Sequence, residues 1–491
     1  MRLFDPRKAD LKTLENPDEP GEPPSVFGSL KRRGGVSWKE KIPGWWAGVT
    51  IAAPRVEAAL EAEKAKKLVL ELVKRIKRGD ERAVQELNDA YFQTAESFRD
   101  SVKSVLGNRE VLFETNATTA LMLIRALSGV KRGQIVTTED LPQTLYWTMR
   151  GGDPHLTQKP RPLPKRDLLL PPNLGFFSSH PEVRPGGERI KIGLKKIPLY
   201  DGSTPTGQTE FLENLESAVS NPETRMVVIP HVTRTGQILP VTQARRIIDK
   251  ENSGRKQERK ILFVVDAAQS IGRVPLEEIR KAHEASDFFF FTTAKALGNV
   301  LGNAVVTARR KLVGQGISHF LNSPFSKYAK YYQFPTKYER VYDFLDSRDF
   351  HTAVSLPELK GGLVAFNARY AGPQEKLERE DERIIEETKR NREKVVQALE
   401  KIPLIEVIKP REDAPFAPSV ISFKLRNTEA KAEDLKPALQ GHDLGYGLIT
   451  VGALVDNGVL RLEIPTYRQM PSVEKLVGKI RLLLGLPEKN Y

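Results

Sequence analysis

Two neighbouring stretches decide the fold, ILFVVDAAQSIG at residues 261–272 and SDFFFFTTAKALGN at residues 286–299. Each contains a continuous apolar run, which is typical of a strand whose two faces are both covered. Polar residues follow each run, with Asp266 after the first and Lys295 after the second. Because the carboxyl ends of parallel strands meet at one edge of a sheet, we expect this carboxylate and this amine at the edge where open α/β sheets bind ligands.

Further apolar runs occur on both sides of these two stretches, and helical patterns separate several of them. The runs are VLFET (111–115), QIVTT (134–138), RMVVIPHV (225–232) and NAVVTA (303–308). Alternation of buried strands with helices indicates a mostly parallel sheet that is covered on both sides. The sequence therefore predicts an α/β fold.

The chain divides into three parts by composition, and the second of them contains an insertion. Residues 1–44 are rich in Pro, Gly and charge and predict an extended arm, and residues 45–350 predict the large α/β domain. A basic, Pro-rich insertion interrupts that domain at residues 151–192. Residues 351–491 predict a long linking helix over 374–401 and a smaller α+β domain, because short strands and helices follow one another there.

Composition excludes several kinds of chemistry. The 491 residues contain no cysteine, so the chain offers no disulfide, no thiolate metal ligand and no persulfide carrier. No apolar run approaches the roughly 18 residues of a membrane span, and we expect a cytoplasmic protein.

The net charge of +14 is spread along the chain without a recognisable nucleic-acid module, which favours a small-molecule partner. Nucleic-acid binding through the basic insertion stays an alternative and predicts a steep loss of affinity with salt.

Asp266 and Lys295 together suit one cofactor chemistry. A carboxylate can keep the nitrogen of a pyridoxal ring protonated, and an amine can form a Schiff base with the aldehyde of that ring. Desolvation and nearby positive charge would lower the pKa of the amine enough for it to react. The alternative is that Asp266 caps the next helix and Lys295 is a solvated lysine, and each residue taken alone favours this alternative.

Several segments, taken in order, resemble the class V aminotransferase family of pyridoxal-phosphate (PLP) enzymes. They are NATTALMLI (116–124), similar to the phosphate-binding turn; HVTRTGQILPV (231–241); DAAQSIG (266–272), similar to the cofactor-ring motif; TTAK (292–295), similar to the lysine motif; and RLEIPTY (461–467), similar to an R-x-S-x-x-x-Y segment. The resemblance implies fold type I, PLP as the cofactor and an amino-acid substrate. It lies nearest to the branch of isopenicillin-N epimerases and cysteine desulfurases.

The resemblance also implies roles for single residues. Lys295 would form the Schiff base, Asp266 would face the ring nitrogen, Gln269 would reach the ring hydroxyl, and His231 would lie beside the ring. Arg461 would bind the carboxylate of the substrate, as suits a planar bidentate donor. The structural alternatives are a core histidine at 231 and a strand arginine paired with an acid at 461.

The phosphate would be bound mainly at the start of a helix. The resemblance assigns Ala117, Thr118 and Thr119 to this site, where backbone amides and the helix dipole favour an anion, and it adds Thr292. An ordinary N-cap by Asn116 or Thr118 is the alternative.

A further stretch implies a second subunit. FLDSRDFHTAVSLPELKGG (344–362) resembles the family segment that crosses to the partner in dimers of this fold. Ser347 would then contact the phosphate that is bound by the partner, so a homodimer is implied.

Departures from the family pattern leave the reaction open. Ala294 stands where the family often has His, and Leu141 or Pro142 stands where an aromatic residue or His usually covers the ring. We expect an aminotransferase, with an epimerase or a C–S/β-lyase of the same fold as the alternative. A hypothesis of another class is a catalytically degenerate PLP fold that serves as a binding or scaffold protein. Cysteine desulfurase is disfavoured because the chain lacks the persulfide thiol.

Overall fold

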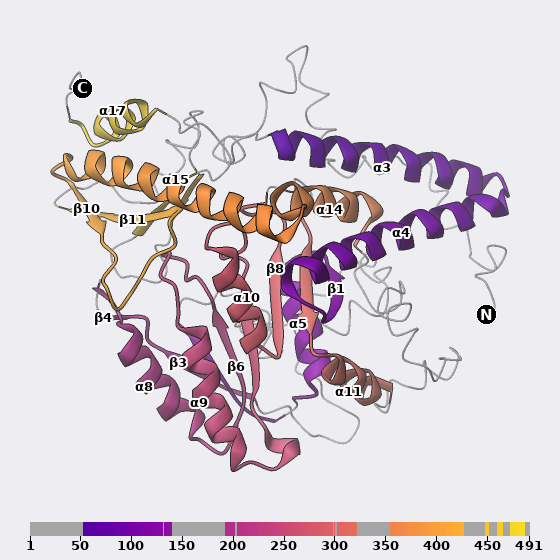
Figure 1. Ribbon diagram of the computed structural model, residues 1–491, viewed down its shortest axis with the longest axis horizontal. Helices are drawn as coiled ribbons and strands as arrows, with labels where there is room; N and C mark the ends of the chain where they lie inside the picture. Colours follow the sequence, from indigo (N-terminus) through magenta and orange to yellow (C-terminus); the bar gives the residue numbers. More distant parts are fainter. Residues whose placement is uncertain are drawn as a thin grey trace, which may run out of the picture.

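The computed structural model describes residues 53–130, 132–139, 192–201, 204–297, 299, 302–321, 354–426, 447–450, 459–464 and 472–486. A seven-stranded sheet with the order β1-β9-β8-β7-β6-β2-β3 forms the centre (Figure 1). Its strands are β1 (Glu110–Glu114), β2 (Gly133–Thr138), β3 (Ile192–Ile197), β6 (Thr224–Pro230), β7 (Leu262–Asp266), β8 (Phe288–Thr292) and β9 (Ala304–Ala308). A short antiparallel pair, β4 (Tyr200–Asp201) and β5 (Thr204–Pro205), lies apart from this sheet.

Strand directions in the sheet are mostly parallel. β3, β2, β6, β7 and β8 pair in parallel, whereas β9 is antiparallel to both β8 and β1. β1 therefore points the same way as β8, and its carboxyl end lies at the same edge. The prediction of a mostly parallel α/β sheet is confirmed. The apolar runs in the sequence extend further than the strands, because β6 ends at Pro230 and β7 at Asp266.

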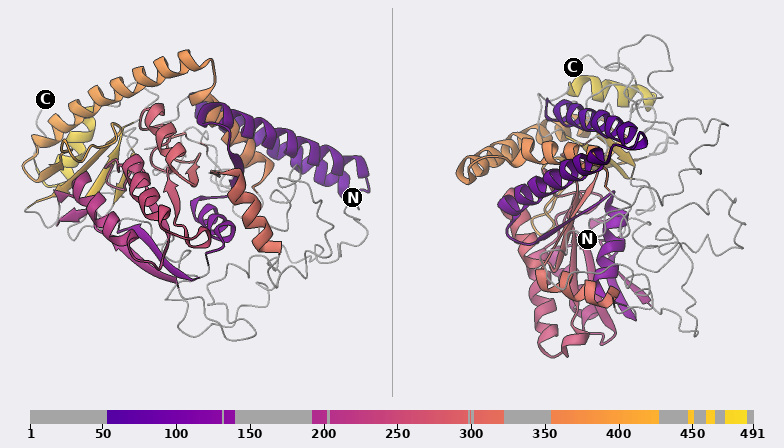
Figure 2. Two further views of the ribbon diagram at one scale, coloured as in Figure 1. Left: turned by 60° about the horizontal axis from the view of Figure 1, so that its bottom comes forward. Right: turned by 90° about the vertical axis from the view of Figure 1, so that its right-hand side faces the viewer.

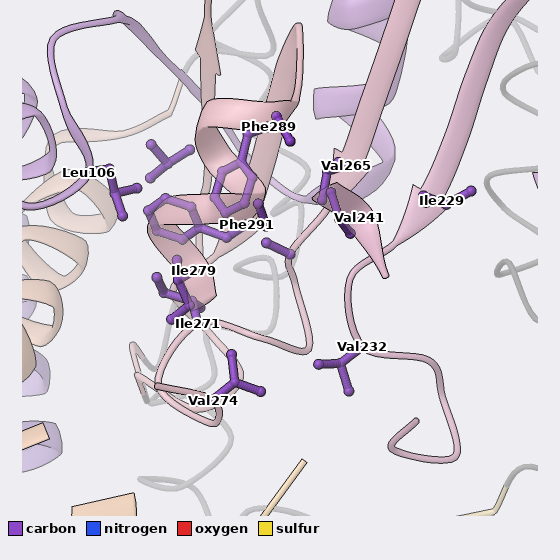
Figure 3. Close-up of a cluster of buried hydrophobic side chains, with 14 of the residues drawn as sticks. Leu106, Ile229, Val232, Val241, Val265, Ile271, Val274, Ile279, Phe289 and Phe291 are labelled. Carbon is purple, nitrogen blue, oxygen red and sulfur yellow. The ribbon is translucent and has the colours of Figure 1, made fainter. Parts of the chain in front are cut away.

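The four phenylalanines of β8 explain why its apolar run is continuous. Side chains alternate between the faces of a strand, so Phe288 and Phe290 pack on one side of the sheet and Phe289 and Phe291 on the other. The first pair packs with α5 (Ala117–Ser128) and α11 (Arg310–Leu321). Figure 3 shows the second pair near Leu106 and Ile279.

The second layer contains more helices. It is built from α4 (Glu81–Leu106), α8 (Gln208–Val219), α9 (Val241–Ser253), α10 (Leu276–Ala285) and α14 (Leu356–Tyr370). Both faces of the sheet are thus covered by helices, as predicted. A single turn of 3-10 helix at Gln257–Arg259 precedes β7.

Two long helices occupy the predicted helical region near residues 54–105. They are α3 (Ala53–Lys77) and α4 (Glu81–Leu106), which pack side by side and extend past the sheet (Figures 1 and 2). Gly79 separates them with φ +87°, a left-handed conformation that favours glycine. Asp80 caps α4 by accepting a hydrogen bond from the backbone N–H of Arg82 at 3.0 Å. Helix α14 (Leu356–Tyr370) packs against both.

A second, antiparallel sheet lies towards the C-terminus. Its order is β10-β11-β13-β12, formed by β10 (Ile405–Ile408), β11 (Val420–Leu425), β12 (Gly447–Thr450) and β13 (Val459–Glu463). Helices α15 (Gln374–Glu400) and α17 (Val473–Leu483) pack on it and share a separate apolar core. The predicted helix over 374–401 and the smaller α+β unit are confirmed.

Several predictions lie outside the described residues. These are the arm at 1–44, residues 151–191 of the insertion, Leu141 and Pro142, and Ser347. The last residue that we assigned to the insertion, Ile192, is instead the first residue of β3. None of the described helices is long and apolar enough to span a membrane.

Candidate active site

The carboxyl ends of β6, β7 and β8 place three predicted residues at one edge of the sheet. Pro230 pairs with Asp266, and Asp266 pairs with Phe290. The backbone N–H of His231 donates to the carbonyl oxygen of Asp266 at 2.9 Å, so the chain leaving β6 stays beside the end of β7. Thr292 ends β8 two residues beyond Phe290. His231, Asp266 and Thr292 therefore share this edge.

Asp266 is a buried carboxylate at the end of β7. Its side chain is 8% exposed, and its Oδ1 accepts a hydrogen bond from the backbone N–H of Ala268 at 2.8 Å. Burial raises the pKa of the Asp266 carboxyl, while the positive charge of Lys295 and the Ala268 N–H act in the opposite direction. The hydrogen bond to Ala268 matches the capping alternative. The electrostatic interaction with Lys295 matches the cofactor hypothesis.

Lys295 lies three residues beyond β8 in a partly buried position. Burial is the main cause that lowers the pKa of its amine, from 10.5 to about 8. Asp266 opposes this shift, and the neighbouring guanidinium groups of Arg461 and Arg273 add to it. The solvated lysine of the alternative interpretation is therefore not what the structure shows. Lys295 and Asp266 interact electrostatically, as we expected from their positions in the sequence.

A buried polar cluster fixes the loop that carries Lys295. The hydroxyl of Thr293 donates to Oδ1 of Asn303, and it accepts from Nδ2 of Asn299 at 3.0 Å and from the backbone N–H of Asn303 at 3.2 Å. Helix α14 covers this cluster through Gly362, where a Cβ atom would lie 2.7 Å from Asn303 Nδ2. The loop is thus bonded internally and closed by a helix that admits no side chain there.

Thr293→Val is expected to loosen this loop. Valine has nearly the shape of threonine, but it leaves the amides of Asn299 and Asn303 buried without their hydroxyl partner. We expect a loss of about 2–3 kcal/mol in the free energy of unfolding, measured by urea denaturation. Thr307→Val is the matched control, because its buried hydroxyl makes only a 3.4 Å hydrogen bond to Phe289 O. Equal losses in the two variants would contradict the anchoring role.

His231 is deeply buried at this edge. It is 2% exposed, and its Nδ1 has no hydrogen-bond partner among the described residues. Burial lowers the pKa of the imidazole from 6.5 to about 4. The side chain is therefore neutral at pH 7, with a ring nitrogen available to a ligand. Both the core alternative and a place beside a ring are compatible with this geometry.

The lowered pKa predicts a loss of stability in acid. Unfolded His231 binds a proton below about pH 6.5 and folded His231 only below about pH 4, so the folded state loses stability as the pH falls through this window. From pH 7 to pH 5 this group removes about 2 kcal/mol from the free energy of unfolding. His231→Gln should show a pH dependence that is smaller by that amount in urea titrations. An unchanged pH dependence would contradict the burial argument.

The start of α5 follows the carboxyl end of β1 and lies near the same edge, because β1 runs parallel to β8. Asn116 caps this helix, with its Oδ1 accepting from the backbone N–H of Thr119 at 3.0 Å. The hydroxyl of Thr119 donates to the carbonyl oxygen of Asn116 at 2.9 Å. The N-cap alternative for Asn116 is thus realised, and the predicted turn into a helix is observed, with α5 beginning at Ala117. The side chain of Thr118 lies outside the described residues.

Thr292 offers an unused hydroxyl. Its Oγ1 is buried and has no hydrogen-bond partner among the described residues. A buried polar atom without a partner destabilises a protein unless a ligand or water satisfies it. This orphaned hydroxyl at the edge therefore fits a phosphate oxygen.

A cluster of charges links this edge to the second sheet, and sequence reasoning missed two of its members. Arg273, in the turn after β7, donates to Oε1 of Gln269 and, at 2.6 Å, to Oε2 of Glu463. Arg461 donates to Oε1 of the same Glu463 and, at 2.9 Å, to the carbonyl oxygen of Arg234. Glu463 thus lies between two guanidinium groups. The only signal in the sequence was its spacing of two from Arg461, which puts both side chains on one face of β13.

The charges in this cluster perturb one another strongly. Burial alone would raise the pKa of the Glu463 carboxyl, but Arg273, Arg461 and Lys295 together lower it to about 2. Burial lowers the pKa of Arg461 to about 10. Glu463 and Arg461 are therefore charged at neutral pH, and both act electrostatically on the Lys295 amine.

These residues together fit a pyridoxal phosphate. Such a cofactor needs an amine of lowered pKa, a carboxylate opposite it and donors for a phosphate. The structure offers Lys295, Asp266, the start of α5 and the orphaned hydroxyl of Thr292 for these functions. Perturbed pKa values of this kind cluster at functional sites.

Comparison with solved structures places the fold. The cysteine desulfurase of Thermococcus onnurineus NA1 superimposes with a TM-score of 0.51 and 19% identity, over 85% of this chain and 92% of that chain. A C-DES variant with glycine covalently linked to the PLP cofactor superimposes with a TM-score of 0.55 and 14% identity, also over 85% and 92%. The ureidoglycine-glyoxylate aminotransferase of Bacillus subtilis gives 0.50 and 13%, over 82% and 87%. The chain has the fold of type I PLP enzymes.

These neighbours agree with the resemblance to class V PLP enzymes, and identities below 20% show the fold alone. No protein-family model and no curated protein sequence matches the chain. Because one fold can host many reactions, the function of this protein depends on the residues of its own site.

Proposed function

We propose that this protein is a PLP-dependent enzyme of the class V aminotransferase type, acting on an amino acid or a related amine. The proposal rests on the interaction between Lys295 and the buried carboxylate of Asp266. Burial lowers the pKa of the Lys295 amine to about 8, and the charge of Asp266 acts on it. An amine with that pKa is a nucleophile at mildly alkaline pH and can accept or return a proton near neutrality.

Each residue then has a defined role. Lys295 would hold the cofactor covalently, and Asp266 would stabilise a positive charge on the ring nitrogen. His231 would lie beside the ring, and Gln269 would reach the ring hydroxyl. When bound, PLP supplies an electron sink that stabilises negative charge at the amine-bearing carbon of the substrate. Lys295 would move the proton at that carbon.

The phosphate is assigned to a different group of residues. Ala117, Thr118 and Thr119 would bind it at the start of α5, where amides and the helix dipole favour an anion. Thr292 would donate its hydroxyl, which has no partner among the described residues. Ser347 would contribute from the second subunit of a homodimer. Arg461 is assigned to the substrate.

Three further expectations belong to this proposal. The protein works in the cytoplasm, it acts as a homodimer, and its large domain spans 45–350 while the smaller one spans 351–491. Size-exclusion chromatography with light scattering tests the dimer.

The reaction type depends on which bond is broken. An epimerase or a C–S/β-lyase would use the same lysine and aspartate, since the fold and cofactor do not fix the outcome. Lys295 and Asp266 support an enzyme over a degenerate scaffold, because a scaffold does not require a partly buried amine that interacts with a buried acid.

A visible spectrum followed by a substrate panel tests the proposal. The purified protein is incubated with PLP, and a band near roughly 410–430 nm is expected. Amino acids and simple amines are then added one by one, while absorbance, deuterium uptake at Cα and the release of keto acid and ammonia are recorded. Keto-acid release without ammonia indicates transamination, keto-acid release with ammonia indicates a β-lyase, and deuterium uptake without keto acid indicates epimerisation. A protein that stays colourless with added PLP would reject the enzyme in favour of the scaffold.

A further inference from the structure

Arg461 is already engaged by the chain itself. One terminal nitrogen donates to the carbonyl oxygen of Arg234 at 2.9 Å, and the other donates to Glu463 Oε1. Only Nε has no partner among the described residues, and it is buried. A guanidinium binds a carboxylate best with two parallel N–H groups, and in Arg461 both terminal nitrogens already donate a hydrogen bond within the chain.

Glu463 is held in place from two sides. Its other oxygen, Oε2, accepts from Arg273 at 2.6 Å, and Arg273 itself is 3% exposed. Because Glu463 is two residues from Arg461 on one strand, both side chains leave the same face of β13. The carboxylate is thus a fixed part of the site, and at neutral pH it stays charged.

We propose that Glu463 is a specificity-determining residue that acts as an internal carboxylate on Arg461. An incoming carboxylate would have to displace Glu463 from the guanidinium or approach a like charge at contact distance. The site then selects against substrates with a carboxylate beside the amino group and favours amines without one. This inference rests on the proposed function. Of the two substrate classes proposed there, amino acids and related amines, it favours amines without a carboxylate beside the amino group.

Binding of a simple carboxylate tests the inference without any reaction. The probes are sodium propionate and its neutral isostere propionamide, and their dissociation constants for the PLP-treated protein are measured by ligand-observed NMR. In Glu463→Gln we expect propionate to bind about tenfold more tightly or better, because a charge-assisted hydrogen bond becomes available. Propionamide should bind equally to both proteins.

Two further variants test whether the gain in propionate binding depends on Arg461 and on the position of the removed charge. Adding Arg461→Met to Glu463→Gln should abolish the gain, since the freed guanidinium is then missing. Glu378→Gln is the matched control, because Glu378 also pairs with an arginine, Arg280 at 2.7 Å, but far from Lys295 in sequence and on the outer helix α15. Thermal unfolding of each variant confirms that it is folded. Should Glu463→Gln not fold, Glu463→Ser replaces it and carries the same expectation.

The outcomes separate cleanly. Propionate affinity within twofold of the wild type, a gain that persists without Arg461, or an equal gain in the control would overturn the inference. So would tight propionate binding by the wild-type protein. A failure of PLP to colour the protein bears on the proposed function alone, because the propionate measurement does not depend on a visible band.

Discussion

Lys295→Ala is expected to abolish the visible band of the PLP-treated protein and to lower turnover by about 10³-fold or more. The Lys295 amine acts electrostatically on Asp266, and its lowered pKa makes it reactive. Alanine leaves the polar cluster of Thr293 untouched, so the loop should keep its shape. Absorbance spectra and steady-state rates with the best substrate of the panel measure the effect.

The control for this variant is Lys281→Ala on α10. Lys281 is an exposed lysine that pairs with Glu277 at 2.7 Å and Glu278 at 3.0 Å. Its replacement should leave both the spectrum and the rate unchanged. If the Lys295 variant kept its visible band, covalent attachment at this residue would be wrong, and another amine would have to be sought.

The sequence predicts that Asp266 and Lys295 lie at one edge of the sheet, and the reason for this prediction is geometric. Continuous apolar runs mark buried parallel strands, and parallel strands deliver the residues that follow them to one edge. The β8 run of Phe288–Phe291 shows the limit of this argument. The four phenylalanines in a row indicate that both faces of β8 are buried. The sequence does not show which helices cover each face, and only the structure places α5 and α11 on one side and the larger helical layer on the other.

Contacts between distant segments could not be predicted in the same way. Glu463 and Arg273 are 190 residues apart, and their ion pair depends on how the second sheet meets the turn after β7. No period or motif marks such a contact. Gln269 is assigned to a ring hydroxyl by the motif, whereas in the structure Arg273, four residues further along the chain, donates to its Oε1. The motif assignment of Gln269 stays a prediction.

The polar cluster around Lys295 was missed for a related reason. Thr293, Asn299 and Asn303 look like ordinary loop residues in the sequence, since such residues are common in turns. Their burial arises because α14, more than 50 residues further along the chain, closes over them through Gly362. A glycine on a helix, such as Gly362, does not reveal from the sequence which distant residue packs against it.

Asp266→Asn is the second change with a large expected effect. The asparagine keeps an oxygen that can accept from the backbone N–H of Ala268, so the turn after β7 is preserved. The negative charge is lost, and with it the group that keeps a ring nitrogen protonated. We expect turnover to fall by about 10²- to 10³-fold. Because Asp266 holds the pKa of Lys295 up against burial, the pKa of that amine should also fall below about 8.

A matched buried acid distinguishes this effect from simple destabilisation. Asp287 is 6% exposed, accepts from the backbone N–H of Phe263 at 2.9 Å and pairs with Arg245 at 3.0 Å, at the opposite end of β8. Asp287→Asn should lower the free energy of unfolding, since it leaves Arg245 without its buried partner, yet it should leave the absorbance of the PLP-treated protein and its pH dependence unchanged. Asp266→Asn should do the reverse. If both variants changed the spectrum alike, the role of Asp266 would be structural, because a charge that acts on the ring can act only from the edge that carries Lys295.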